Sequence, residues 1–283
     1  MDLNEKKRPI APPRLVIEPT SGWSSLGLRD IWEYRELLVL LVWREIRGTY
    51  RQTALGVSWL IIRPLLNMLV LTAVFGFVVR VPTDNIPYPL FYLGALLPWG
   101  YFSNAVMRAS GSLVQNMEII SKVYFPRMII TIAGVLSGLI DLAASFVLFL
   151  VFMLIYQVPL RVELLWLPLL AVEVAFFALA TGLWLATLSV KYRDVAFAVN
   201  FLLQVLMYAS PVIYPVSMVP QRFLWLYNLN PMVSIIQSFR WALLGSGQFP
   251  LQSMLVSLGI ILVLLISGAF IFRRTERTIV DML

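Results

Sequence analysis

The sequence predicts an all-α membrane protein with six transmembrane helices, an N-terminal amphipathic interfacial helix, a short cytoplasmic helix and two outer re-entrant half-helices. Of its 283 residues, 60% are hydrophobic and 13% charged, against about 45–50% and about 25% in soluble domains. Apolar runs of 20 to 29 residues, each with at most one charged residue, recur along the chain, and each is long enough to cross a bilayer. Cysteine and histidine are absent, which excludes disulfides, thiolate nucleophiles and imidazole bases.

The N-terminal segment divides into two parts. Residues 1–29 predict a flexible tail because prolines and scattered charges dominate them. No apolar stretch follows the basic start, so we expect no cleaved signal peptide and a cytoplasmic N-terminus. Residues 30–52 predict a helix with Asp30 as its N-cap and Glu33 at capping-box spacing. Its charged stripe indicates a helix lying in the membrane surface, either as a lipid anchor or as a contact surface for a cytoplasmic partner.

Six spans are expected within a transmembrane domain of residues 53–272, followed by a cytoplasmic tail of residues 273–283. Threading them with the N-terminus inside places twelve Lys and Arg close to the inner face and four, namely Arg80, Arg161, Arg222 and Arg240, outside. This asymmetry predicts that both termini are cytoplasmic. The spans are residues 55–79, 88–107, 128–156, 164–189, 195–214 and 251–272.

Residues 215–250 are too apolar for a solvated loop and contain too many prolines and glycines for a simple span. They predict two half-helices on the outer side. In the second, Asn230 can cap the free amides while Pro231 occupies the first helical position, where no donor is needed. Gly245 and Gly247 are expected to end it.

The chemistry that the chain lacks is informative. It has no Gly-Lys dipeptide and therefore no phosphate-binding G-x-x-x-x-G-K-[ST] loop, so any ATP hydrolysis belongs to another polypeptide. We expect no metal and no cofactor in this chain. The ionisable residues inside the spans are Arg63, Asp141 and Glu173, which either pair structurally or line a pore. They form no acid cluster of the kind that a membrane enzyme needs.

The net charge is +7. In a membrane protein, such an excess of Lys and Arg is typical of cytoplasmic loops that face anionic lipid, and it does not indicate nucleic-acid binding.

The loop at residues 115–127 has a polar start, one or two amphipathic turns and a proline stop. Its apolar residues predict a hydrophobic cluster that docks into a partner's groove or rests on lipid headgroups. This loop cluster comprises Ile119, Ile120, Val123, Tyr124 and Phe125, with Glu118, Lys122 and Arg127 around it.

Aromatic side chains recur inside the spans as well as at their ends. Such rings can stack on the C–H faces of sugars, or they can pack in the core or against lipid. Those inside the spans are Trp59, Phe75, Phe91, Tyr92, Phe176, Phe177, Trp184, Phe201 and Tyr208.

Five motifs resemble the membrane subunits of polysaccharide ABC exporters, the type-2 group that moves lipid-linked O-antigen, teichoic acid and related glycans. Their order and spacing agree over residues 28–275. The motifs are WREIRGTYRQTALGVSWLIIRPL at 43–65, KVYFPR at 122–127, KYRD at 191–194, SPVIYP at 210–215 and NPM at 230–232.

The resemblance implies a homodimer that forms a channel between its copies and binds two copies of a separate ATPase, which would hold ATP and Mg²⁺. It implies a lipid-substrate gate at the interfacial helix, including Tyr34, Arg35, Arg44, Arg47 and Arg51. It implies a coupling helix in the loop from Asn116 to Arg127 and a second ATPase contact at Lys191, Arg193 and Asp194. The implied channel lining comprises Trp59, Arg63, Phe75, Phe91, Tyr92 and Tyr208, and the implied exit gate comprises Tyr214, Trp225, Tyr227, Asn230 and Arg240.

The sequence is therefore interpreted as a permease of the bacterial inner membrane that exports an undecaprenyl-phosphate-linked polysaccharide, with O-antigen favoured. A type-2 exporter of a drug or small lipid is the main alternative. A membrane enzyme of glycan assembly is a further one, although the chain lacks the acids for it.

Overall fold

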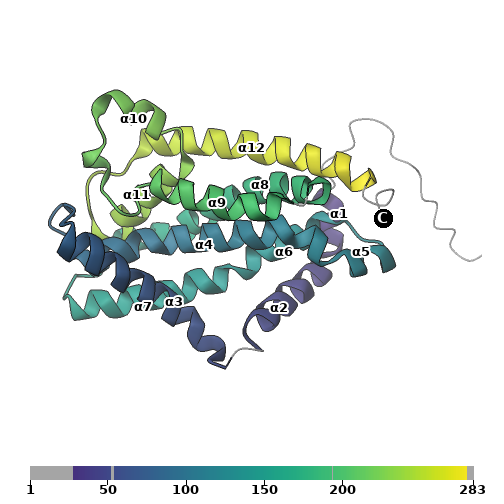
Figure 1. Cartoon of the computed structure of the whole chain (residues 1–283), viewed down its shortest axis with the longest axis horizontal. Coiled ribbons are helices and arrows are strands. Elements are labelled where there is room, and N and C mark those ends of the chain that lie inside the picture. Colours follow the sequence, from purple (N-terminus) through teal and green to yellow (C-terminus); the bar gives the residue numbers. More distant parts are fainter. Residues whose placement is uncertain (1–27, 52–53, 193, 279–283) are drawn as a thin grey trace, which may run out of the picture.

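The computed structural model describes residues 28–51, 54–192 and 194–278, and every regular element in these ranges is a helix. The long helices run side by side along the long axis of the molecule, while α3 crosses the bundle obliquely (Figure 1). Helices α1 and α5 lie at one end with the end of α12, α2 runs from this end towards the middle of the molecule, and α10 and α11 lie at the other end. We call these the α5 end and the α11 end.

The N-terminal helix has a different start from the one expected. Helix α1 (Leu28–Glu33) and helix α2 (Arg35–Arg51) follow one another across a turn at Tyr34. The chain is already helical at Leu28, so the prediction that Asp30 caps the helix is wrong. The Asp30 carboxylate instead accepts a bond from Arg273 of α12 at 3.3 Å, a distant partner that local spacing does not reveal.

Four helical segments are long and apolar enough to cross a membrane, namely Gly56–Val78, Met128–Ile155, Val162–Lys191 and Leu251–Glu276. The first combines a 3₁₀ turn (Gly56–Ser58), helix α3 (Trp59–Leu71) and a π-helical turn (Thr72–Val78). Gly76 lies in the wide turn, where a Cβ would come within 2.8 Å of the Tyr88 ring. The absence of a side chain at Gly76 therefore lets the first expected span approach the start of the second closely.

The third, fourth and sixth expected spans are observed with shifted ends. Helices α6 (Met128–Ser137) and α7 (Leu139–Ile155) meet at Gly138, and a 3₁₀ turn (Val162–Trp166) leads into α8 (Leu167–Lys191). Helix α12 (Leu251–Thr278) continues six residues past the expected limit at 272. Residues 273–278 of this helix lie in the segment expected as a cytoplasmic tail, and Arg273 pairs there with Asp30 and Glu276.

The remaining two expected spans differ more. Helix α4 (Tyr88–Gln115) extends beyond residue 107, so Arg108 lies inside a helix and not in the following loop. Helix α9 (Val195–Tyr208) has only 14 residues, because the chain turns at residues 209–213 and Tyr214 folds back to donate to the carbonyl of Tyr208 at 2.8 Å. The short helix α5 (Met117–Lys122) follows α4 directly.

Two short helices are present in residues 215–250, after a 3₁₀ turn at Val216–Met218. Helix α10 (Gln221–Tyr227) is short, and α11 (Pro231–Leu244) begins as expected. The Asn230 Oδ1 accepts from the Met232 amide at 3.1 Å, and Gly245 ends α11 in the left-handed conformation at φ 66°. This confirms the predicted cap and stop of the second half-helix.

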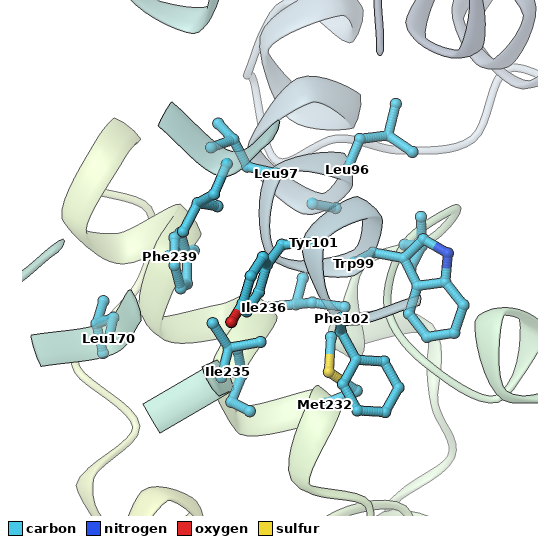
Figure 2. Packing of buried hydrophobic residues seen from close by; sticks show 14 of the residues in the cluster. Leu96, Leu97, Trp99, Tyr101, Phe102, Leu170, Met232, Ile235, Ile236 and Phe239 are labelled. Carbon is cyan, nitrogen blue, oxygen red and sulfur yellow. The ribbon is translucent and has the colours of Figure 1, made fainter. Parts of the chain in front are cut away.

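The core is built around α4, whose residues 90–99 are all buried. Leu96, Leu97, Trp99, Tyr101 and Phe102 of α4 pack against α11 and α8 in one cluster (Figure 2). The helices α4 and α8 pack closely at Gly182, where a Cβ would lie only 2.5 Å from that of Ala109. Small residues at this crossing let the two helices pack closely, as in other membrane bundles.

Candidate functional site

The loop cluster is exposed only in part. Tyr124 is 85% exposed and Val123 is also exposed, whereas Ile120 and Phe125 are buried and Ile119 is half-buried. The expectation of one compact exposed cluster is therefore wrong for Ile120 and Phe125, because they belong to a second core between α2, α6, α8 and α12. Glu118 and Lys122 are exposed and pair at 2.6 Å. The exposed tip thus consists of Val123 and Tyr124 beside this ion pair.

Helix α12 holds the other side of this loop. The Arg127 amide donates to Glu276 Oε1 at 2.8 Å, and the Arg127 guanidinium donates to the Glu276 carbonyl at 2.6 Å. Glu276 also lies 3.7 Å from Arg273. These charge-assisted bonds connect the loop to the last turns of the final helix.

Glu276→Gln is expected to loosen the loop without unfolding the bundle. The glutamine oxygen can still accept from the Arg127 amide, but the negative charge that strengthens this bond and pairs with Arg273 is lost, a change worth about 1.5 kcal/mol. Backbone amides of residues 117–127 should then exchange about tenfold faster with deuterium in the purified protein. Glu163→Gln is the matched control, since Glu163 pairs with nearby Arg161 at the α11 end. Equal exchange in the wild type and Glu276→Gln would show that the charge of Glu276 does not hold the loop.

The interfacial helix is attached to the same loop. The Arg44 guanidinium donates to Asn116 Oδ1, and the Asn116 amide donates to the Ser112 carbonyl at 2.8 Å. Leu41 of α2 lies in the second core beside Ile120. Helix α2 and the loop therefore form one packed unit at the α5 end.

The other residues expected at the lipid-substrate gate are on the surface. Tyr34 and Arg47 are exposed, as is Arg35. The Arg35 guanidinium lies 5.7 Å from the centre of the Trp32 ring, and that of Arg47 lies 6.0 Å from Trp43. The Arg51 side chain lies outside the described residues. These cation–π pairs place charge next to exposed apolar rings, an arrangement that suits a membrane surface.

The second expected ATPase contact joins α8 to α9. Lys191 and Asp194 are exposed, and the Lys191 ammonium lies 5.1 Å from the centre of the Tyr192 ring. Arg193 lies outside the described residues. Nearby Leu183 and Ala186 of α8 belong to the same buried cluster as Ile120, so this turn lies at the α5 end with the loop cluster.

A cavity of about 320 Å³, lined by both apolar and polar side chains, opens between α3, α4, α7 and α9. It brings together Trp59 and Arg63, whose guanidinium lies 5.6 Å from the ring centre. Asp141 also lines it and pairs with Arg108 at 2.6 Å. The remaining polar side chains around it are Asn67, Ser103, Asn104 and Ser145.

Of the other residues expected in the channel wall, some are buried and some are exposed. Phe91 and Tyr92 are buried in the core of the chain, so the structure does not support them as surface-lining rings. Tyr208 is exposed and Phe75 half-buried. Glu173 is buried; its Oε1 accepts from Ser257 at 3.3 Å, and its Oε2 has no hydrogen-bond partner within the described residues.

At the α11 end, Arg240 is only 5% exposed. Its guanidinium lies 3.6 Å from the centre of the Phe91 ring and donates to the Val212 carbonyl at 3.2 Å. Beside it is a cavity of about 280 Å³ lined by Asp84, Gln237 and Gln248, among others.

The remaining exit-gate residues surround the start of α11. Asn230 donates to Ala209 and Ser210 at 3.1 and 2.9 Å, which fixes the half-helix against the end of α9. The rings of Tyr214 and Tyr227 lie 6.4 Å apart, and burial raises the pKa of the Tyr227 phenol, so it remains neutral. Trp225 is exposed.

Sequence reasoning missed Glu276, Asp30 and Arg108 as structural partners, and Asn67 and Asn104 as cavity residues. The two asparagines carried a usable signal, because amides inside apolar spans are costly. The ion pairs Arg108–Asp141 and Arg273–Asp30 left no signal in the sequence, since their partners lie 33 and 243 residues apart.

A family model described as ABC-2 type transporter matches residues 36–244. The O-antigen export system permease protein RfbA of Myxococcus xanthus is 33% identical over 88% of this chain and 96% of its own length. The RfbA permease of Klebsiella pneumoniae is 27% identical over 88% of this chain and 95% of its own. The polysialic acid transport protein KpsM of Escherichia coli is 25% identical over 71% of this chain and 78% of its own.

Proposed function

The chain belongs to the ABC-2 type transporter family, and from this membership we infer that it is the permease subunit of an ATP-driven polysaccharide exporter. The observation that carries the inference is the match to O-antigen export permeases over nearly their whole length. We propose that the cargo is an undecaprenyl-phosphate-linked polysaccharide, with O-antigen favoured by these relatives. Transport across the inner membrane, and not catalysis, is the role of this chain.

We propose that a separate ATPase, which holds ATP and Mg²⁺, binds at the α5 end. The exposed tip of Val123 and Tyr124 supports this, because an aromatic anchor beside charged residues suits a partner's groove. Lys191, Arg193 and Asp194 would provide a second contact. A displacement of the tip by the ATPase would be transmitted to α12 through the bonds between Arg127 and Glu276. It would be transmitted to α2 through the bond between Asn116 and Arg44.

We propose further that two copies of the chain form a channel and bind two ATPase subunits. The α2 helix would admit the lipid-linked substrate, and α10 and α11 would re-enter from outside and gate the exit. Six membrane crossings with both termini in the cytoplasm would use α4 and α9 in addition to the four long apolar segments. Trp59, Arg63, Phe75 and Tyr208 would contribute to the channel wall.

Purification of the chain from its native membrane, with deletion of its gene, tests this function. We expect a nucleotide-binding subunit to copurify stoichiometrically, the assembly to hydrolyse ATP, and the deletion strain to lose its surface polysaccharide. Normal surface polysaccharide together with loss of drug or lipid export would instead identify the small-molecule exporter. A chain that purifies alone without ATPase activity would contradict the exporter assignment.

A further inference from the structure

Arg240 of α11 carries a positive charge inside the molecule. Its side chain is only 5% exposed, and an arginine stays protonated in proteins. A buried charge is costly unless an opposite charge or hydrogen bonds compensate for it. In the part of the chain that the structure describes, no Asp or Glu side chain lies within 4.0 Å of this guanidinium. The charge of Arg240 is therefore not neutralised by an ion pair there.

The hydrogen bonds of Arg240 are also incomplete. Of the five N–H donors of a guanidinium, one donates to the Val212 carbonyl at 3.2 Å, and the Phe91 ring covers one face. The Nε atom is buried and has no hydrogen-bond partner among the described residues. By contrast, half-buried Arg108 of α4 pairs with Asp141 at 2.6 Å. Arg240 thus lacks the anionic partner that the other internal arginine has.

The cavity of about 280 Å³ beside Arg240 offers space for such a partner. Four parts of the chain form it: the turn before α4, the start of α4, the segment after α9, and α11 with the residues that follow it. Phe91 and Arg240 are its buried members, whereas Asp84 is exposed. The polar side chains that line it are those of Asp84, Ser217, Gln237, Arg240, Ser246 and Gln248.

This lining favours an oxyanion over other ligands. A cation would be repelled by Arg240, and a neutral ligand would leave the buried charge without an opposite charge. The planar guanidinium matches phosphate and carboxylate geometry. A phosphate has more acceptor oxygens than a carboxylate, so it can accept from Arg240 and from the amides of Gln237 and Gln248 at once.

We propose that this cavity binds a phosphate group, with Arg240 as its cationic residue and Gln237 and Gln248 as neutral donors. The phosphate belongs either to a lipid headgroup at the α11 end or to free phosphate in solution. Asp84 opposes binding through its negative charge. The site goes beyond the export function proposed above and does not depend on it, because phosphate binding is measured on this chain alone.

Phosphate binding to the full-length chain in detergent tests the site, without an ATPase whose nucleotide sites would also take phosphate. The probe is radiolabelled inorganic phosphate in equilibrium dialysis at constant ionic strength. We expect Arg240→Met to bind it about thirtyfold more weakly, because the charge-assisted hydrogen bonds are lost. Asp84→Asn should bind it about threefold more tightly, since an exposed charge acts weakly.

Arg222→Met is the matched control. Arg222 is an exposed arginine of α10, also at the α11 end, and its guanidinium lies 4.7 Å from the centre of the Phe223 ring. It should bind phosphate like the wild type. Phosphate should also raise the melting temperature of the wild type and of Arg222→Met, but not that of Arg240→Met. If Arg240→Met does not fold, Arg240→Lys replaces it, and we expect about fivefold weaker binding because the planar fork is lost.

A soluble short-chain lipid, dihexanoyl phosphatidic acid, distinguishes the two sources of the phosphate. If the site takes a lipid headgroup, this lipid should displace the labelled phosphate at a concentration at least tenfold lower than unlabelled phosphate does. If the site takes free phosphate, the lipid should compete no better than phosphate itself. Either result supports a phosphate site and assigns its source.

Three outcomes would overturn the site. The first is equal phosphate binding by the wild type and the Arg240 variant. The second is a rise in melting temperature that sodium chloride reproduces at the same ionic strength, which would indicate a general salt effect. The third is a wild type that binds no phosphate; a lower melting temperature of Asp84→Asn would then identify Asp84 as the counter-ion of Arg240 in solution. None of these outcomes involves glycan export, so the proposed function is tested separately.

Discussion

Tyr124→Asp is expected to abolish glycan export while leaving the permease folded. The side chain is 85% exposed, so its replacement costs the isolated chain little. In the proposed complex, however, an aromatic anchor would be lost and an unpaired carboxylate would be buried in the ATPase groove. We expect the ATPase to associate about a hundredfold more weakly, a loss of about 2.8 kcal/mol.

Copurification of the ATPase and the amount of surface polysaccharide measure this effect. Tyr124→Phe should preserve both, because the ring remains. Tyr156→Asp makes the same change at an exposed tyrosine that ends α7 near the α11 end, and it should leave ATPase binding intact. Normal binding and export in Tyr124→Asp would refute the assignment of the loop tip as the docking site.

Gly182→Leu should have the largest effect on folding. A Cβ at Gly182 would already lie 2.5 Å from that of Ala109, and Ala109 is fully buried in α4. A leucine would force apart the two helices that form the centre of the bundle. Overpacking of this kind costs about 3 kcal/mol.

Thermal melting of the purified protein in detergent, together with its membrane yield, measures the loss. Gly259→Leu is the matched control, since it makes the same change in α12, where nothing lies within 4 Å of the added Cβ. We expect Gly259→Leu to melt like the wild type and Gly182→Leu to melt well below it. Similar melting temperatures of both variants would show that α4 and α8 can separate without loss of stability.

The sequence predicted those parts of the fold that depend on local patterns. Apolar runs located the long helices, and Asn230, Pro231 and Gly245 gave the limits of α11 because capping is decided within a few residues. The predicted length of α9 was wrong. The sequence remains apolar after Tyr208, but the chain turns there, and the Tyr214 hydroxyl donates to the Tyr208 carbonyl. Apolar residues alone do not distinguish a helix from a buried turn.

Within the candidate site, the sequence predicted correctly the exposure of a residue that no distant helix covers. Tyr124 was expected at the surface and is exposed there, whereas Ile120 and Phe125 face inward because α2 and α12 cover them. Phe91 was expected in a channel wall, but the Arg240 guanidinium covers its face. Which ring is covered depends on helices that are far apart in sequence, and a single sequence does not specify their packing.

The ion pair between Arg108 and Asp141 restricts how the chain is inserted during synthesis. Each charge alone costs about 2.5 to 3.5 kcal/mol when a helix partitions from the translocon into lipid. The two residues are 33 positions apart, so Arg108 emerges from the ribosome well before its partner. Helix α4 is therefore expected to wait beside the translocon until α7 arrives, and the two to enter the bilayer as a neutral pair.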